Sequence, residues 1–264
     1  MNLGIRGKAA LVAGSSSGIG EAVAKGLATE GANLLLCARR REELDRVACG
    51  IREASDVRVE VQASDLSSGE GCREVLRRLK ETYGGADILV PNAGGPPSGG
   101  FGSLDEQRLA QAHRLTYLSG VRLIQGVLPR MRERKWGRIV AITSVSVFEP
   151  IPHLILSNAY RSALTATLKT LSQEAAADGV TVNTVCPGYT MTERLKSLSA
   201  SIAEDSGRSV EDVLADWKAT IPAARIGGPD EVAAAVVFLC SASAAYINGV
   251  ALPVDGGRLK GLLS

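Results

Sequence analysis

A short glycine-rich run, GSSSGIG, lies near the N-terminus at 14–20. The run follows an apolar segment and precedes one with helical periodicity. A glycine-rich turn at such a junction lets the backbone approach a pyrophosphate, with amide donors and the helix N-terminus directed at it. We therefore predict a dinucleotide site with the contacts Gly14, Ser15, Ser17, Gly18, Ile19 and Gly20.

A second chemically informative stretch, LLLCARRREEL, ends the next apolar segment. Ala38 stands where an acidic residue would bind the ribose hydroxyls of NAD. Arg39 and Arg40 follow it, and a guanidinium can bind a phosphate through two parallel hydrogen bonds. The stretch favours NADP(H) over NAD(H), with Ser15 as a second ligand of the 2′-phosphate. The alternative is that these arginines only open a solvated helix.

Segments with strand and helix patterns alternate along the whole chain. Short apolar runs predict strands at 8–13, 33–38, 57–62, 87–90, 138–143, 180–185 and 250–254. Amphipathic segments predict helices at 18–30, 41–54, 69–82, 105–134 and 230–241. Repeated strand–helix–strand order predicts an α/β fold, a single Rossmann-like doubly wound parallel sheet with helices on both faces. We expect one domain over 1–264.

Further motifs occur in a fixed order after the glycine-rich turn. Asp65-Leu66 follows the third predicted strand, Asn92-Ala93-Gly94 follows the fourth, and Pro187-Gly188 follows the sixth. Together with the GxxxGxG spacing and the block at 227–257, they resemble the short-chain dehydrogenase/reductase family over 7–257. The resemblance implies an adenine contact at Asp65 and Leu66. It also implies cofactor contacts at Asn92, Ala93, Gly94 and Thr190, and contacts beside the nicotinamide at Pro187, Gly188 and Thr192. Ala13 and Pro91 depart from the family's usual Thr and Asn.

The family's catalytic residues can be carried over only in part. Members use a Ser, a Tyr as acid/base, a Lys that lowers the pKa of the Tyr and binds the nicotinamide ribose, and an assisting Asn. Ser144 matches the Ser, but Ser157 stands thirteen residues later in place of the Tyr, and Arg161 replaces the Lys. Tyr117 replaces the Asn. Ser157 and Arg161 are four residues apart and share a helical face, so Arg161 could still bind the ribose.

The proton donor therefore stays open at the level of sequence. Tyr160 lies about 60° around the helix from Ser157, so it could reach the pocket or pack against a neighbour. Tyr117 is a second candidate phenol. His153, in the loop before the helix, is either a proton donor or a surface residue. The candidate catalytic set is Ser144, Ser157, Arg161, Tyr117 and Tyr160.

Bulk properties exclude several other classes of protein. The net charge of 30 − 28 = +2 is too weak to indicate nucleic acid or an anionic membrane. Five scattered cysteines and two distant histidines predict reduced thiols and no metal site. No apolar run reaches membrane-spanning length. We expect a cytoplasmic protein without membrane or nucleic-acid partners. The family resemblance implies a homo-oligomer, a tetramer or dimer.

These observations predict an NADP(H)-dependent oxidoreductase that transfers hydride between nicotinamide and a small carbonyl or alcohol substrate. It resembles 3-oxoacyl-[acyl-carrier-protein] reductases and has an atypical proton donor. In the family the segment at about 189–220 forms a substrate lid, and Tyr189 and Met191 begin it here. Two alternatives remain. One is a catalytically inert NADP(H)-binding protein, a sensor or partner subunit. The other is a dinucleotide-dependent enzyme whose chemistry needs no phenol and which uses Ser144 and Arg161 to polarise the substrate.

Overall fold

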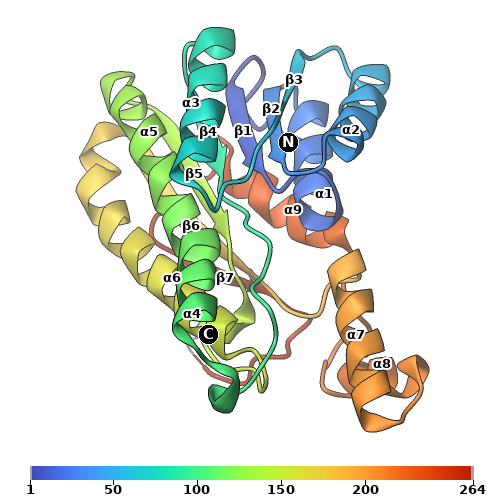
Figure 1. The fold of residues 1–264 in the computed structure, drawn as a ribbon. Coiled ribbons are helices and arrows are strands. Elements are labelled where there is room, and N and C mark those ends of the chain that lie inside the picture. Colours follow the sequence, from blue (N-terminus) through green and yellow to red (C-terminus); the bar gives the residue numbers. More distant parts are fainter. Residues whose placement is uncertain (1, 263–264) are drawn as a thin grey trace.

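A seven-stranded parallel sheet forms the centre of the structure, a computed structural model that describes residues 2–262 (Figure 1). The strand order is β3-β2-β1-β4-β5-β6-β7, and every neighbouring pair is parallel. The strand order changes direction between β1 and β4, as in doubly wound dinucleotide-binding sheets. The strands are β1 (Ala9–Ala13), β2 (Asn33–Ala38), β3 (Val59–Ala63), β4 (Ile88–Val90), β5 (Gly137–Ile142), β6 (Val180–Pro187) and β7 (Ala251–Val254).

Helices cover both faces of the sheet (Figure 1). One face packs against α1 (Gly18–Thr29), α2 (Arg41–Ala54) and α9 (Pro229–Leu239). The other packs against α3 (Gly69–Tyr83), α5 (Ser119–Glu133) and α6 (Ile155–Ala175). Two separate clusters of buried apolar side chains result, one on each face. This explains why β1, β4 and β5 are buried along their whole length and why their sequences show no polar alternation.

The predicted strands and the α/β architecture are confirmed, and each strand end lies within two residues of its predicted position. The segment 105–134 differs from the single helix predicted for it. It forms α4 (Glu106–Ala112), a π-helical turn (His113–Leu118) and α5. The apolar periodicity continues through the turn, so the sequence pattern does not show the local widening. That widening changes the direction of every side chain within the turn, including Tyr117.

Two helices follow β6 and stand at the carboxyl edge of the sheet, drawn in orange in Figure 1. They are α7 (Glu193–Ser206) and α8 (Val210–Ala219), referred to below as the α7–α8 hairpin. Thr192 caps α7 by accepting a hydrogen bond from the Leu195 amide, and Ser209 caps α8 in the same way. Short 3₁₀ turns occur at Phe101–Ser103, Val145–Val147 and Ala176–Asp178. Within the described residues, no helix is both long and apolar enough to cross a bilayer.

Candidate active site

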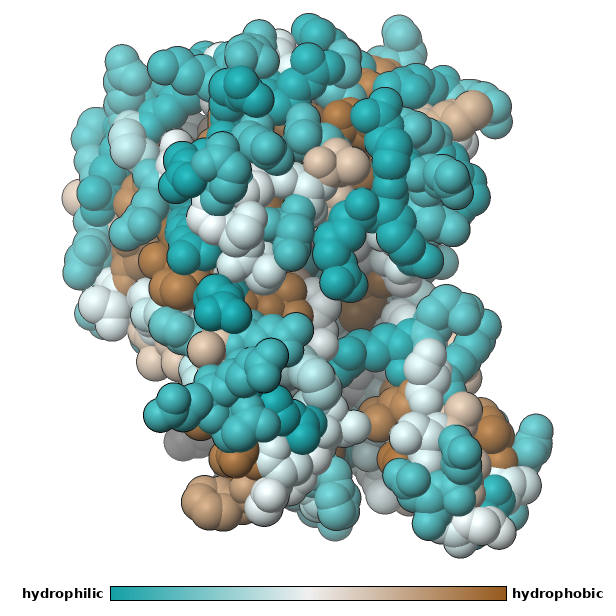
Figure 2. Space-filling view, in the orientation of Figure 1, coloured by the Kyte–Doolittle hydropathy of each residue, from teal (hydrophilic) through white to brown (hydrophobic). Residues whose placement is uncertain are grey.

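A pocket of about 1240 Å³ lies at the carboxyl edge of the parallel sheet. Its walls come from the loops after β1 to β6, from the start of α6 and from the α7–α8 hairpin. Figure 2 shows the surface hollowed where the hairpin meets the body of the molecule. Ligands of open parallel sheets bind at this edge, beside the point where the strand order reverses. The position of the pocket therefore matches that of a dinucleotide site.

The glycine-rich turn forms one end of this pocket. Gly14, Ser17, Gly18 and Ile19 line it. The Ser17 side chain makes no capping hydrogen bond, so it does not occupy the amide donors of the first turn of α1. Gly20 lies outside the lining and acts by close packing: a Cβ there would stand 2.1 Å from the Gly14 carbonyl oxygen. The backbone thus forms a concave turn that fits a pyrophosphate. Side chains in place of its glycines would fill this space.

Ser15 does not take the role predicted for it. Its side chain is fully buried, and its hydroxyl accepts a hydrogen bond of 3.0 Å from the Cys37 amide. The Ser15 amide donates in turn to the Cys37 carbonyl. Ser15 therefore ties the turn to β2 and is absent from the pocket lining. The prediction of Ser15 as a ligand of a 2′-phosphate is wrong, because its side chain points into the protein.

The nucleotide end of the pocket is lined by Ala38, Arg39 and Arg40. Both arginines are exposed, and neither pairs with a carboxylate of the described residues. Arg41, the next residue, instead pairs with Asp45 at 2.8 Å and is not part of the lining. Two unpaired guanidinium groups at the end of β2 suit a phosphate on the adenosine ribose. The remaining predicted cofactor contacts also line the pocket: Asp65, Leu66, Asn92, Ala93, Gly94, Pro187, Gly188, Thr190 and Thr192.

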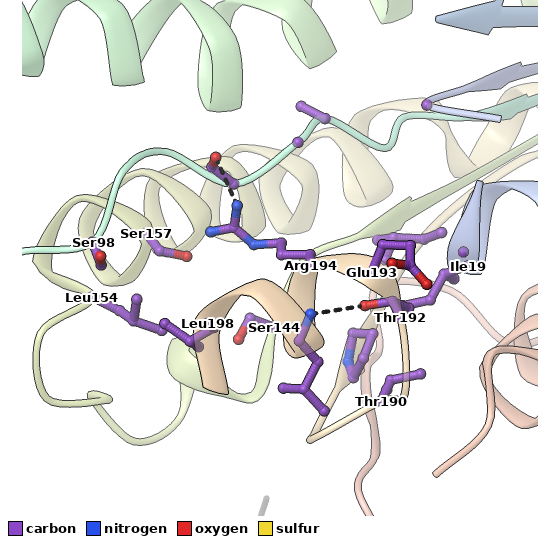
Figure 3. A pocket seen from close by; sticks show the side chains of 18 of the residues that line it. Ile19, Ser98, Ser144, Leu154, Ser157, Thr190, Thr192, Glu193, Arg194 and Leu198 are labelled. Atoms are coloured by element: carbon purple, nitrogen blue, oxygen red, sulfur yellow. Dashed lines mark hydrogen bonds between the residues drawn. The ribbon is translucent and has the colours of Figure 1, made fainter. Parts of the chain in front are cut away.

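Ser144, Ser157 and Arg161 come together at the other end of the pocket (Figure 3 labels the serines). β5 ends at Ile142, and Ser144 begins the next short turn, where its hydroxyl accepts from the Ser146 amide at 3.1 Å. The Arg161 Nε donates to Ser157 Oγ at 3.0 Å. Its Nη1 donates to the carbonyl oxygens of Ile142 and Thr143. The sequence-based grouping of these three residues is thus reproduced in space.

The charge of Arg161 is poorly compensated in this position. Burial lowers the pKa of its guanidinium to about 10, and the nearby charge of Arg194 contributes in the same direction. No carboxylate of residues 2–262 forms an ion pair with Arg161. Ser157 Oγ therefore lies next to a positive charge without an ion-pair partner among these residues. Negative charge that develops on a substrate oxygen at this point would be stabilised.

The two candidate tyrosines lie outside the pocket. The Tyr117 hydroxyl is 3.1 Å from Thr167 Oγ1, on the outer side of α6. The Tyr117 and Tyr160 rings both pack against His113, at centroid distances of 5.4 and 5.5 Å. This placement does not support the prediction that these phenols contribute to catalysis, which stays a prediction. The π-helical turn and the position of Tyr160 on α6 direct both rings into a packing cluster with His113.

Several further pocket residues lie outside the predicted catalytic and cofactor-binding sets. His153 lines the pocket with a left-handed backbone, φ 60°, and its carbonyl accepts from the Gly99 amide at 2.6 Å. Such a conformation is uncommon outside glycine and clusters at functional sites. Tyr189 also lines the pocket, with its ring stacked on Trp217 of α8, whereas Met191 does not. Arg194 and Arg258 complete the charged part of the lining. No sequence motif indicated either arginine.

Within residues 2–262, no cluster of His, Cys, Asp and Glu is arranged to hold a metal ion. The pocket instead combines a phosphate-binding turn, an arginine pair at the adenosine end and a serine pair beside a buried guanidinium. A parallel doubly wound sheet that carries this set defines an NAD(P)-dependent oxidoreductase. The chain belongs to the short-chain dehydrogenase/reductase family. The family model that matches residues 13–258 is described as enoyl-(acyl carrier protein) reductase.

Relatives and solved structures cover almost the full length of the chain. The uncharacterized oxidoreductase YvaG of Bacillus subtilis is 32% identical, over 98% of this chain and 99% of its own. The 3-oxoacyl-[acyl-carrier-protein] reductase FabG of Aquifex aeolicus is 33% identical, over 97% and 99%. The structure of L-sorbose reductase from Gluconobacter frateurii, complexed with NADPH and L-sorbose, matches with a TM-score of 0.94 and 36% identity, over 99% and 100% of the two chains.

Proposed function

We propose that the protein is an NADP(H)-dependent carbonyl reductase or alcohol dehydrogenase whose proton donor is not the family tyrosine. The observation that carries this proposal is the arrangement of Ser144, Ser157 and Arg161 at the end of the pocket opposite the adenosine side. The unpaired Arg39 and Arg40 support NADP(H) as the cofactor, as does the NADPH-bound L-sorbose reductase structure. When bound, the reduced nicotinamide supplies a hydride.

The chain's own residues would hold the substrate oxygen. Arg161 fills an acceptor position of Ser157 Oγ, so the Ser157 hydroxyl proton is free to point into the pocket. Ser144 Oγ accepts from a backbone amide and can likewise donate its proton to a carbonyl oxygen. Two hydroxyl donors backed by a buried guanidinium polarise the carbonyl and stabilise the alkoxide that forms.

We assign the role of proton donor to His153. The pocket carboxylates Asp65 and Glu193 are engaged by Ser67 and Lys196, and Asp205 lies near the C-terminal end of α7. His153 and Tyr189 are the remaining pocket side chains able to act as general acids. The Tyr189 ring is stacked at 4.8 Å on Trp217, and Arg258 lies over it at 5.4 Å, which places it in the packing of the α7–α8 hairpin. His153 lies four residues before Ser157 and is held in its strained conformation by Gly99. It can pass a proton from solvent to the serine pair.

The α7–α8 hairpin is proposed to be the substrate lid. It forms one wall of the pocket and occupies most of the segment at about 189–220 that was expected to form the lid. We further propose a cytoplasmic homo-oligomer. Its five cysteines are all free thiols, which fits a reducing compartment. Exposed apolar side chains, such as Phe101 and Tyr246, fit contact with further copies of the chain. Light scattering coupled to size exclusion measures the assembly.

The function is tested in two steps with the purified protein. NADPH and NADH binding are first measured by fluorescence. NADPH oxidation is then followed with a panel of ketones, aldehydes, quinones and 3-oxoacyl thioesters. The proposal predicts tighter binding of NADPH than of NADH and turnover with at least one carbonyl class. Binding of NADPH with no turnover on any substrate would instead establish the alternative of an inert NADP(H)-binding protein.

A further inference from the structure

A second guanidinium enters the reacting end of the pocket from the first turn of α7. Arg194 reaches across to the loop after β4, where its Nη1 donates to the Gly95 carbonyl and its Nη2 to the Pro96 carbonyl, both at 3.1 Å. Figure 3 shows this guanidinium beside the loop, in the region of Ser157 and Ser144. A Cβ at Gly95 would stand 2.2 Å from Nη2. Glycine at this position therefore makes room for the arginine.

No anion within the described chain offsets this charge. Neither Arg194 nor Arg161 has a carboxylate oxygen within ion-pair distance among residues 2–262. Burial lowers the pKa of Arg194, and Arg194 in turn lowers the pKa of Arg161. Over the whole residue Arg194 is exposed and Arg161 is half-buried, so the two like charges leave a positive region of the pocket that an entering anion would neutralise. Only carbonyl and hydroxyl oxygens accept their hydrogen bonds.

The acidic side chains of the pocket are engaged or distant. Asp65 accepts from the Ser67 amide and hydroxyl. Glu193 pairs with Lys196 at 2.7 Å. Asp205 lies eleven residues beyond Arg194 on α7, about 16 Å along the helix. None of the three neutralises the arginine pair.

The places expected for the phosphates of the cofactor lie elsewhere in the pocket lining. The glycine-rich turn faces Thr192, whose methyl group is 3.1 Å from the position of a Cβ on Gly18. Arg194 instead contacts Gly95 and Pro96. These two residues follow the Asn92-Ala93-Gly94 segment in the loop after β4. Arg39 and Arg40 stand at the adenosine end. An anion at Arg194 must therefore come with the substrate.

We propose that the substrate is an oxo acid, with a carboxylate that binds Arg194 while its carbonyl oxygen binds Ser144 and Ser157. This inference rests on the proposed oxidoreductase function and names its substrate class. The carbonyl carbon accepts a hydride and the carbonyl oxygen a proton, so the oxo acid becomes the hydroxy acid and NADPH becomes NADP⁺. The carboxylate is unchanged. Arg194 suits this role because a guanidinium binds a carboxylate through two parallel hydrogen bonds.

The test compares 2- and 3-oxo acids with their methyl esters, in the wild type, in Arg194→Met and in Arg208→Met. Arg208 is the matched control, because it also belongs to the α7–α8 hairpin but pairs with Asp216 and lies outside the pocket. In the wild type kcat/KM for the preferred acid should exceed that for its ester by about 10- to 100-fold. Arg194→Met should remove this preference, whereas Arg208→Met should keep it.

Calorimetric titration of the NADP⁺ complex with the corresponding hydroxy acid separates this inference from the proposed function. Binding that Arg194→Met abolishes supports the carboxylate site even where turnover fails, and that failure would count against the oxidoreductase function alone. Turnover of acid and ester with equal kcat/KM would overturn the oxo-acid assignment and leave the oxidoreductase function standing. Loss of NADPH affinity in Arg194→Met would also overturn it, because Arg194 would then bind the cofactor.

Discussion

Arg161 and Ser157 are joined across one turn of α6 by a hydrogen bond of 3.0 Å from Nε to Oγ. The same guanidinium holds the backbone at the end of β5 through the carbonyl oxygens of Ile142 and Thr143. The arginine thus fixes the serine, the strand end and the start of the Ser144 loop relative to one another. In the register predicted from the sequence, this hydroxyl and guanidinium stand where the family carries a phenol and an ammonium group, and both residues line the pocket.

Removal of either serine hydroxyl should slow the chemical step. Ser144→Ala and Ser157→Ala should each lower kcat by about 10²- to 10³-fold, because each removes a donor to the developing alkoxide. NADPH affinity should stay the same in both. Ser146→Ala is the matched control, since this nearby buried hydroxyl has no hydrogen-bond partner and lies outside the pocket. Steady-state kinetics and fluorescence titration measure the two effects, and unchanged kcat in both variants would refute the role of the serine pair.

The imidazole of His153 should be needed for proton delivery. His153→Gln keeps hydrogen-bonding capacity but cannot act as a general acid, so kcat should fall by about 10²-fold. Tyr189→Phe, by contrast, should keep the kcat of the wild type, because its ring serves in packing against Trp217. A His153→Gln variant with the kinetics of the wild type would assign proton delivery to solvent alone.

The arginines after β2 should decide between the two nicotinamide dinucleotides. The double variant Arg39→Ala/Arg40→Ala should raise the KM for NADPH by about tenfold or more, since charge-assisted phosphate contacts are lost. The KM for NADH should change little. Arg41→Ala is the control, because Arg41 pairs with Asp45 and is absent from the pocket lining. Equal effects on NADPH and NADH would show that these residues do not contact a 2′-phosphate.

Stability at acid pH should depend on Glu231, in the first turn of α9. Arg225 and then the Gly228 amide lower the pKa of this carboxyl from 4.5 to about 2. A carboxyl whose pKa is depressed on folding stabilises the protein above its unfolded pKa, and this contribution is lost as the pH falls through the folded pKa. The Tm of the wild type should exceed that of Glu231→Gln at pH 6, and the gap should close between pH 4.5 and about 2. A gap that is constant with pH would contradict this linkage.

The parts of the site that sequence predicted are those set by local chain geometry. The glycine-rich turn needs only a strand, a tight turn and a helix N-terminus in order, and these are visible as Gly14, Gly18 and the apolar run before them. Ser157 and Arg161 were paired correctly because four residues along a helix return to the same face. Strand positions followed from uniformly apolar runs that both helical layers cover.

The parts that sequence missed depend on contacts between distant segments. Arg194 meets Gly95 across 99 residues, and no local pattern encodes that meeting. Ser15 belongs to the glycine-rich motif, yet its side chain faces Cys37 of the neighbouring strand. The direction of Tyr117 is set by a π-helical turn that leaves the apolar periodicity intact. Residue type marked these side chains as candidates, but only tertiary packing decides which of them reach the pocket.

The most direct test follows deuterium from 4-deuterated NADPH, of the stereochemistry that the enzyme transfers, into the product of the preferred carbonyl substrate. It compares the wild type with Tyr117→Phe/Tyr160→Phe. Both rings lie outside the pocket, so both proteins should give an alcohol with one deuterium on the former carbonyl carbon, at rates within about twofold of each other. An alcohol formed by the wild type alone would show that Tyr117 or Tyr160 is needed for catalysis. Deuterium in no product of either protein, with NADPH bound, would show that the pocket is not a redox site.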